Sequence, residues 1–84
     1  MPRFYFNLHE CGTTVEDEEG RLCENVAEAR YKALGDARGI MASEVIKGKL
    51  CLACRLDVLD EGRALVLELP FADAVDIQGL PADR

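Results

Sequence analysis

The sequence contains little histidine and serine, two residue types that often perform catalysis, and no apolar stretch long enough to cross a membrane. Its 84 residues include no tryptophan, one histidine (His9) and one serine (Ser43). A catalytic Ser–His pair could therefore be formed only by these two residues. Apolar stretches such as Ala64–Leu67 are far shorter than the ~20 residues of a spanning helix. Residues 1–9 lack the apolar core and the cleavage site of a secretory signal. We therefore expect a cytoplasmic protein without membrane association, whose cysteines stay reduced.

The length and the composition predict one small folded domain. A chain of 84 residues buries only about 60% of the surface that its unfolded form exposes, which limits the core to one layer. The sequence is 49% apolar and 31% charged, as is usual for a globular protein. We assign residues 1–77 to a single domain and residues 78–84 to a flexible C-terminal tail.

The net charge of −6 is unevenly distributed along the chain. Residues 25–55 carry six basic and three acidic side chains, whereas the segments on either side are acidic. An acidic protein repels nucleic acid at long range, so nucleic acid is not the expected partner. The basic segment keeps one alternative open, which is a weak nucleic-acid interface. Its residues would be Arg30, Lys32, Arg38, Lys47, Lys49 and Arg55.

Segments with a period of two predict the strands. Arg3–Leu8 alternates apolar and polar side chains, and Thr13–Val15 is a candidate for a short return strand. Residues 52–58 and 65–69 also alternate, and a turn at residues 61–62 would join them in a hairpin. This turn predicts three cross-strand pairs: Val58 with Leu65, Leu56 with Leu67, and Cys54 with Leu69.

One helix is predicted between these strands. Asn25 can cap its first turn while Glu28 reaches back, and Gly48 can end it in the left-handed conformation. Arg30 and Glu44 both project into the apolar side of this helix, so each must extend its charged end to water or find a partner. Residues 71–75 could form one further helical turn. The apolar stripe of the helix consists of Val26, Ala27, Ala29, Ala33, Leu34, Ala37, Ile40, Met41 and Val45.

Together these elements predict an α+β fold in two layers, with one amphipathic helix packed on a three- to four-stranded, mostly antiparallel sheet. The order along the chain is β-(β)-α-β-β. We expect the first, third and second main strands to lie side by side in that order, because every neighbouring pair is then antiparallel. The connection from the first to the second main strand would then be a right-handed crossover.

Four cysteines are the most suggestive chemical feature of the sequence. Cys51 and Cys54 form a C-x-x-C pair, and together with Cys11 and Cys23 they equal the four thiols of a structural zinc site. An extended segment opposes this interpretation, because it would point the two sulfur atoms of the pair to opposite faces. We therefore expect small buried or incidental thiols and no cofactor, with a zinc or redox site as the alternative.

Two further candidates concern His9 and an acidic run. His9 and Cys11 are two residues apart and could share one face of a strand, which keeps a small cysteine-dependent enzyme as an alternative. No orienting group or oxyanion site is evident, so we expect no catalytic residue. Residues 16–19 are four consecutive carboxylates without the ligand spacing of a calcium loop, and they predict a solvated acidic loop.

Several segments form a specific combination when they are taken together. They are the M-P-R-x-x-F pattern of residues 1–6, the run Asp17-Glu18-Glu19-Gly20, the alanine-rich helix, residues 58–63, and the L-P-F-x-D-A pattern of residues 69–74. This combination, which covers residues 1 to about 77, resembles a family of small bacterial proteins of unknown function that is frequent in alphaproteobacteria. The resemblance implies a bacterial, cytoplasmic, one-domain protein, and it implies no activity, cofactor or catalytic residue.

The expected function is a noncatalytic protein-interaction module that associates with itself. The helix has a second, outward side that carries little charge and includes two glycines, which would suit the close docking of another helix. The outward face of the sheet is the other candidate contact surface. The residues of the predicted dimer surface on the helix are Tyr31, Gly35, Gly39, Ala42 and Ile46.

Overall fold

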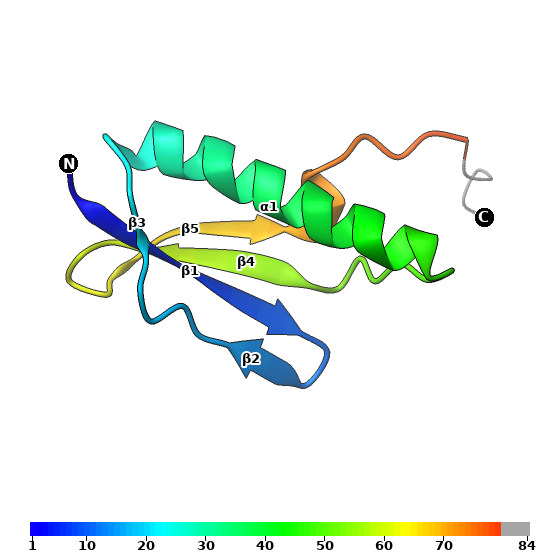
Figure 1. Ribbon diagram of the computed structural model, residues 1–84. Coiled ribbons are helices and arrows are strands. Elements are labelled where there is room, and N and C mark those ends of the chain that lie inside the picture. The colour runs from blue at the N-terminus through cyan, green and yellow to red at the C-terminus, as the bar shows by residue number, and fades with distance from the viewer. Residues whose placement is uncertain (80–84) are drawn as a thin grey trace.

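The structure, a computed structural model, describes residues 1–79 and shows one α-helix lying across one face of an antiparallel sheet (Figure 1). This confirms the predicted α+β fold, although the sheet has five strands and not three to four, because the short strand Arg21–Leu22 was not predicted. The helix α1 spans Val26–Ile46, and the 3-10 helix η1 spans Phe71–Asp73. Residues 80–84 of the predicted tail lie outside the described residues. Within residues 1–79 the strands are β1 (Arg3–Glu10), β2 (Thr13–Val15), β3 (Arg21–Leu22), β4 (Arg55–Leu59) and β5 (Leu65–Pro70).

The predicted order of the main strands is wrong. The observed order is β2-β1-β4-β5, with β3 paired to the start of β1, so the first and second main strands are adjacent and antiparallel. The cause is the return of the chain through β2 and β3, which brings it back to the start of β1 before α1 begins (Figure 1). The helix therefore runs in the direction of β1, and β4 begins beside the far end of β1. The predicted right-handed crossover is wrong for the same reason, because it requires parallel strands.

The hairpin of β4 and β5 forms, but its predicted register is wrong by two residues. The turn is longer than predicted because the carboxylate of Asp60 accepts a hydrogen bond from the N–H of Ala64 (2.9 Å), while Arg63 adopts a φ of 67°. A bulge between Val58 and Leu59 precedes the turn, at the end of β4. A shift of two residues keeps both leucine rows on one face, so the core is preserved. The observed pairs are Leu56 with Leu69, Val58 with Leu67, and Leu59 with Leu65.

The helix begins and ends where its capping residues predict. The side chain of Asn25 accepts a hydrogen bond from the N–H of Glu28 (2.8 Å), and the carboxylate of Glu28 accepts one from the N–H of Glu24 (2.6 Å). Gly48 has a φ of 89°, the left-handed conformation that ends a helix. No helix within residues 1–79 is both long and apolar enough to cross a membrane.

The core combines small side chains of the helix with large side chains of the sheet. The buried line of α1 is narrower than the predicted stripe, since Val26 and Val45 at its ends are largely exposed. Every fourth residue is buried instead, which gives Ala29, Ala33, Ala37 and Met41. The predicted turn after β5 is present as η1, and it also faces the core. The sheet and η1 supply Phe4, Phe6, Leu56, Val58, Leu69 and Phe71.

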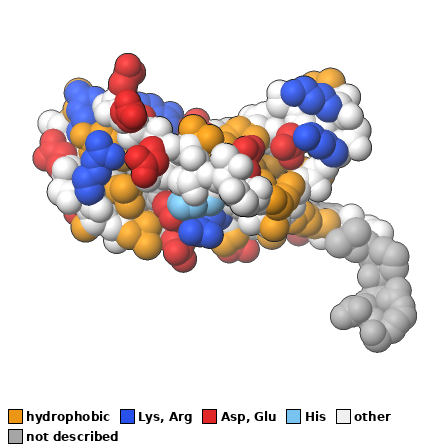
Figure 2. Space-filling model, turned by 90° about the horizontal axis from the view of Figure 1, so that it is seen from below, with side chains coloured by type: hydrophobic (Ala, Val, Ile, Leu, Met, Phe, Trp, Pro, Cys, Tyr) orange, Lys and Arg blue, Asp and Glu red, His pale blue; other side chains and the backbone are white. Residues whose placement is uncertain are grey.

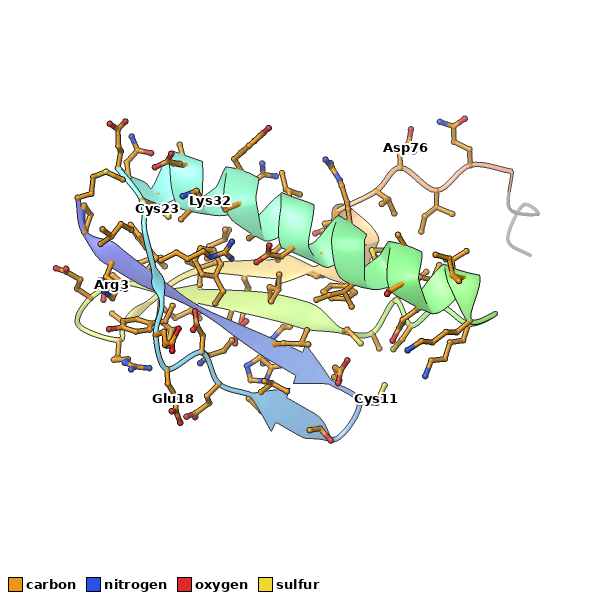
Figure 3. The ribbon with its side chains drawn as sticks, viewed as in Figure 1. Arg3, Cys11, Glu18, Cys23, Lys32 and Asp76 are labelled. Carbon is orange, nitrogen blue, oxygen red and sulfur yellow. The ribbon has the colours of Figure 1, made fainter. Side chains whose placement is uncertain are left out.

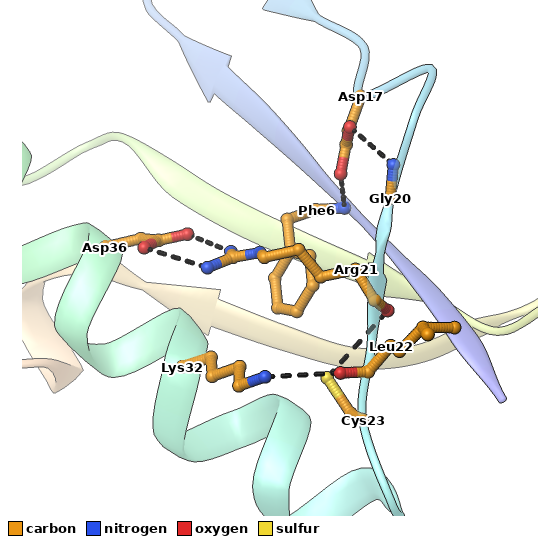
Figure 4. Close-up of polar contacts among 8 residues, drawn as sticks. All are labelled: Phe6, Asp17, Gly20, Arg21, Leu22, Cys23, Lys32 and Asp36. Atoms are coloured by element: carbon orange, nitrogen blue, oxygen red, sulfur yellow. Dashed lines mark hydrogen bonds and ion pairs between the residues drawn. The ribbon is translucent and has the colours of Figure 1, made fainter. Parts of the chain in front are cut away.

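Asp17 holds the segment between β2 and β3 against β1. Its carboxylate accepts hydrogen bonds from the N–H groups of Phe6 (3.1 Å), Gly20 (2.9 Å) and Glu19 (3.2 Å), the first two of which are drawn in Figure 4. Partial burial alone would raise the pKa of Asp17, but the N–H groups lower it below its usual value. Gly20 has a φ of 71°, and a Cβ there would lie 2.7 Å from the carbonyl oxygen of Phe4. The predicted acidic loop thus contains one carboxylate that turns inward.

We expect Asp17→Ala to lower the free energy of unfolding by about 1–2 kcal/mol, because three N–H groups lose a charged acceptor that is partly exposed to water. Asp17→Asn, which keeps one acceptor oxygen without the charge, is the control. Since the folded pKa lies below the unfolded value of ~3.9, the contribution of the charge is present above about pH 4 and is lost as the pH falls through the folded pKa. Urea unfolding at about pH 7 and about pH 3 measures it. An equal difference between wild type and Asp17→Asn at both pH values would contradict this role.

Candidate functional site

A groove runs between the C-terminal half of α1 and the inward face of β1. The helix packs on β4, β5 and η1, so that part of β1 remains uncovered, and the groove encloses about 700 Å³. Its floor consists of Phe6, Leu8 and Leu56, and its wall of Gly35, Asp36, Gly39, Ile40 and Ser43. The groove thus has an apolar floor and a wall that includes small residues.

One end of the groove is closed by an ion pair between β3 and α1 (Figure 4). The guanidinium of Arg21 binds the carboxylate of Asp36 and lies over the ring of Phe6, 4.1 Å from its centroid. Beside it, Nζ of Lys32 donates to the backbone oxygen of Leu22 (3.2 Å). These contacts were not predicted from the sequence, because partners that are 10 or 15 residues apart leave no local pattern.

The other end of the groove leads to a cluster of three thiols. Cys11 lies at the tip of the β1–β2 hairpin, while Cys51 and Cys54 lie in the loop between α1 and β4. The predicted extended segment from residue 52 is wrong, because β4 begins only at Arg55. The Sγ atoms of Cys11 and Cys51 are 3.4 Å apart, and all three cysteines line a hollow of about 310 Å³. This hollow shares Glu10 and Glu44 with the groove. The carboxylate of Glu44 accepts a hydrogen bond from the N–H of Cys51 (3.4 Å), whereas Arg30 is exposed to solvent.

The three thiols differ in acidity. The pKa of Cys51 is lowered, because the thiol of Cys54 and then that of Cys11 donate toward its sulfur, and the N–H of Ala53 adds to this. Burial raises the pKa of Cys54 to about 11. The hydrogen bond with Cys51 raises the pKa of Cys11. Cys51 is partly exposed as well, so it is the thiol of this cluster that most readily becomes a thiolate.

Cys23 does not join the other three cysteines. It precedes α1, whereas Cys51 follows it, and a helix of 21 residues is about 30 Å long. Figure 3 shows Cys11 and Cys23 at opposite ends of the molecule. Cys23 is fully buried, and its N–H donates to the backbone oxygen of Pro2 (3.0 Å). The four thiols therefore do not lie within reach of one metal ion. Within residues 1–79 no group of three or more His, Cys, Asp or Glu side chains is placed to hold a metal ion.

His9 belongs to a polar network on the outward face of the sheet, which Figure 2 shows with the histidine in pale blue. Its Nε2 lies 2.8 Å from Oδ2 of Asp57, and its Nδ1 lies 3.0 Å from Oγ1 of Thr14. Asp57 is only 8% exposed and also accepts from Nε of Arg55 (3.0 Å). Both ring nitrogens of His9 thus have partners other than Cys11, and the Cys–His pair considered from the sequence does not form.

The basic residues of the nucleic-acid alternative do not form one surface. Nε of Arg38 donates to the backbone oxygen of Ala74 (2.7 Å), and Lys32 binds Leu22, so both cations hold the fold together. Arg55 lies on the outward face of the sheet, in the layer opposite to α1. The charges are therefore divided between two faces of the molecule.

The predicted dimer surface on α1 is exposed along its whole length. Tyr31 and Ile46 are 78% and 86% exposed, which is unusual for large apolar side chains. Between them lie Gly35 and Gly39, which also border the groove, and a Cβ added at either would meet no atom within 4 Å. This side of the helix thus presents two protruding apolar side chains that are separated by small residues.

Comparison with known families shows the family to which the chain belongs. The family model described as Domain of unknown function (DUF6894) matches residues 3–72, so the chain belongs to this family. No curated protein and no solved structure is similar enough to count as a match. The resemblance to a family of unknown function is confirmed at this level, whereas the bacterial source and the two terminal patterns stay predictions. The family description assigns no activity.

A double-mutant cycle tests the network on the outward face. Asp57 lies directly opposite Glu68 in the β4–β5 pair, and like charges in this position destabilise a sheet. We expect Glu68→Gln to raise the free energy of unfolding by about 0.5 kcal/mol. In an Asp57→Asn background the same substitution should have almost no effect, as urea unfolding would show. A gain that is equal in both backgrounds would mean that Glu68 does not act through Asp57.

Proposed function

We propose that this member of the DUF6894 family is a noncatalytic protein-interaction module that pairs with a second copy of itself through the outward side of α1. The proposed setting is the bacterial cytoplasm, as the resemblance in the sequence implies. The observation that carries the proposal is the exposure of Tyr31 and Ile46 on either side of a strip of small residues. Such exposed apolar side chains lose contact with water when a partner covers them, which favours association.

The strip has the symmetry that a two-fold dimer requires. In an antiparallel pair of helices centred between residues 38 and 39, Tyr31 of one copy lies opposite Ile46 of the other. Gly35 then lies opposite Ala42, and Gly39 lies next to the symmetry axis. Large side chains therefore meet at both ends, and the glycines allow the two helix backbones to approach closely in the middle. A surface that is complementary to itself in this way supports a second copy as the partner.

The size and charge of the molecule set the expected strength of the dimer. A strip from residue 31 to residue 46 is only about 24 Å long, so it buries less than the ~1,200–2,000 Å² of a stable interface. Each chain also carries a net charge of −6, which opposes association. We therefore expect a dissociation constant on the order of micromolar, which decreases as salt screens the repulsion.

The proposal of a noncatalytic role is supported by the polar side chains, several of which bond to other parts of the fold. His9, Asp57 and Arg55 bond to one another and to β2 on the outward face of the sheet, as described above. Asp17 and Asp36 hold the segment before α1 in place. These side chains therefore have structural partners in the folded chain.

Gly39→Glu tests the helix surface directly. A carboxylate next to the symmetry axis would place two negative charges against each other, so we expect the dimer to disappear at concentrations of about 100 μM or below. The substitution has open space around it and replaces a helix-destabilising glycine, so the monomer should remain folded. Sedimentation equilibrium measures the association, and circular dichroism measures the helix content.

Val66→Glu is the matched control, because it adds the same charge to the outward face of the sheet, where Val66 is exposed. It should leave the association unchanged. Loss of the dimer in Val66→Glu but not in Gly39→Glu would contradict the proposal, because it would show that the interface lies on the sheet. A wild-type protein that remains strictly monomeric at high protein and salt concentration would refute the proposal.

A further inference from the structure

We propose that Cys11 and Cys51 form a reversible disulfide, in which Cys51 attacks a low-molecular-weight disulfide of the glutathione type and Cys11 completes the bond. The inference does not depend on self-association, because it rests on the thiol cluster alone. Cys11 and Cys51 are 40 residues apart in the chain, yet their Sγ atoms are only 3.4 Å apart. A disulfide requires a separation of about 2.05 Å, so a small movement of either segment suffices.

Both segments are able to make this movement. Cys11 follows the last paired residue of β1, at the tip of the hairpin, and is exposed. Cys51 lies between the end of α1 and the start of β4, where the chain belongs to neither element. Both sulfur atoms border a hollow that opens to solvent, so a small disulfide can reach them. The cluster is therefore both close enough and accessible enough for thiol–disulfide exchange.

The surroundings of the three thiols assign their roles. Cys51 receives hydrogen bonds that stabilise its thiolate, so it is the attacking sulfur. Cys54 is buried and keeps its proton, so it acts as a donor that positions the charge on Cys51. Cys11 is the exposed neighbour of Cys51 and takes the second step. The same hollow is lined by the carboxylates of Glu10 and Glu44 and by one basic side chain, that of Lys49.

The exchange proceeds in two steps. The thiolate of Cys51 attacks one sulfur of the oxidant, whose S–S bond breaks and releases one small thiolate. Cys11 then loses its proton to water and attacks the Cys51 sulfur of the mixed disulfide. The Cys11–Cys51 bond forms, and the second small thiolate leaves. The protein loses two electrons and the oxidant gains them, and a reducing thiol pool reverses both steps.

The bond would covalently connect two parts of the fold whose contact in the reduced protein is noncovalent. It would tie the β1–β2 hairpin to the loop after α1, next to Glu10 and Glu44, which border both the groove and the hollow. Oxidation would therefore restrict the open end of the groove. In a reducing compartment such a bond forms transiently, as redox-sensing disulfides do.

Peptide mapping of the full chain in a glutathione redox buffer with a metal chelator tests the proposal. Trypsin places Cys11 in residues 4–21, Cys51 and Cys54 together in residues 50–55, and Cys23 in residues 22–30. We expect oxidised glutathione to link peptide 4–21 to peptide 50–55, with fragmentation assigning the bond to Cys51. The melting temperature should rise on the order of 10 °C on oxidation, because the bond closes a long loop.

Three cysteine variants separate the roles. Cys11→Ser should accumulate a mixed disulfide of glutathione on Cys51, and Cys51→Ser should form no link between the two peptides. Cys23→Ser, which lies outside the cluster, should behave like the wild type and is the control. A bond between Cys51 and Cys54 as the main product would overturn the proposal, as would linkage at an unchanged rate in Cys51→Ser. A wild-type chain that stays reduced in oxidised glutathione would overturn it as well.

Discussion

The close contact between the alanine side of α1 and the sheet is the constraint on which most of this structure depends. Ala29, Ala33 and Ala37 add almost no volume, so the helix backbone lies near β4 and β5, and the phenylalanines of β1 and η1 fill the remaining core. The helix is thereby placed over one side of the sheet, toward η1. Part of β1 stays uncovered, which creates the groove, and the opposite side of the helix is left without a neighbour within the described chain.

The two ends of the groove are held by different interactions. At one end, Arg21 spans from β3 to Asp36 and covers the ring of Phe6, so charge and an aromatic face together fix the segment before the helix. At the other end, Cys11 and Cys51 are in contact without a covalent bond. The first contact is present whatever the redox state, whereas the second can be strengthened by oxidation. The hairpin tip is therefore the part of the fold whose attachment can change.

The site was only partly predictable from the sequence. The C-x-x-C pair and the carboxylate of Glu44 on the apolar side of the predicted helix were both noted from the sequence. Both lie at the thiol cluster in the structure. The grouping of the four cysteines could not be predicted, because it depends on which end of a helix about 30 Å long each cysteine lies. The partners of His9 depend on the strand next to β1, and the predicted strand order named the wrong neighbour.

The sequence by itself determined most elements of this protein, although β3 and the start of β4 were not predicted, and only the tertiary structure decided how the strands pair. The cap of Asn25 and Glu28, the stop at Gly48 and the alternation in β1 act between residues a few positions apart, so local chemistry suffices for them. The strand order follows instead from the return of the chain through β2 and β3, and the hairpin register from the way Asp60 closes its turn. Such choices depend on contacts across the whole fold, and several arrangements bury the same leucine rows equally well.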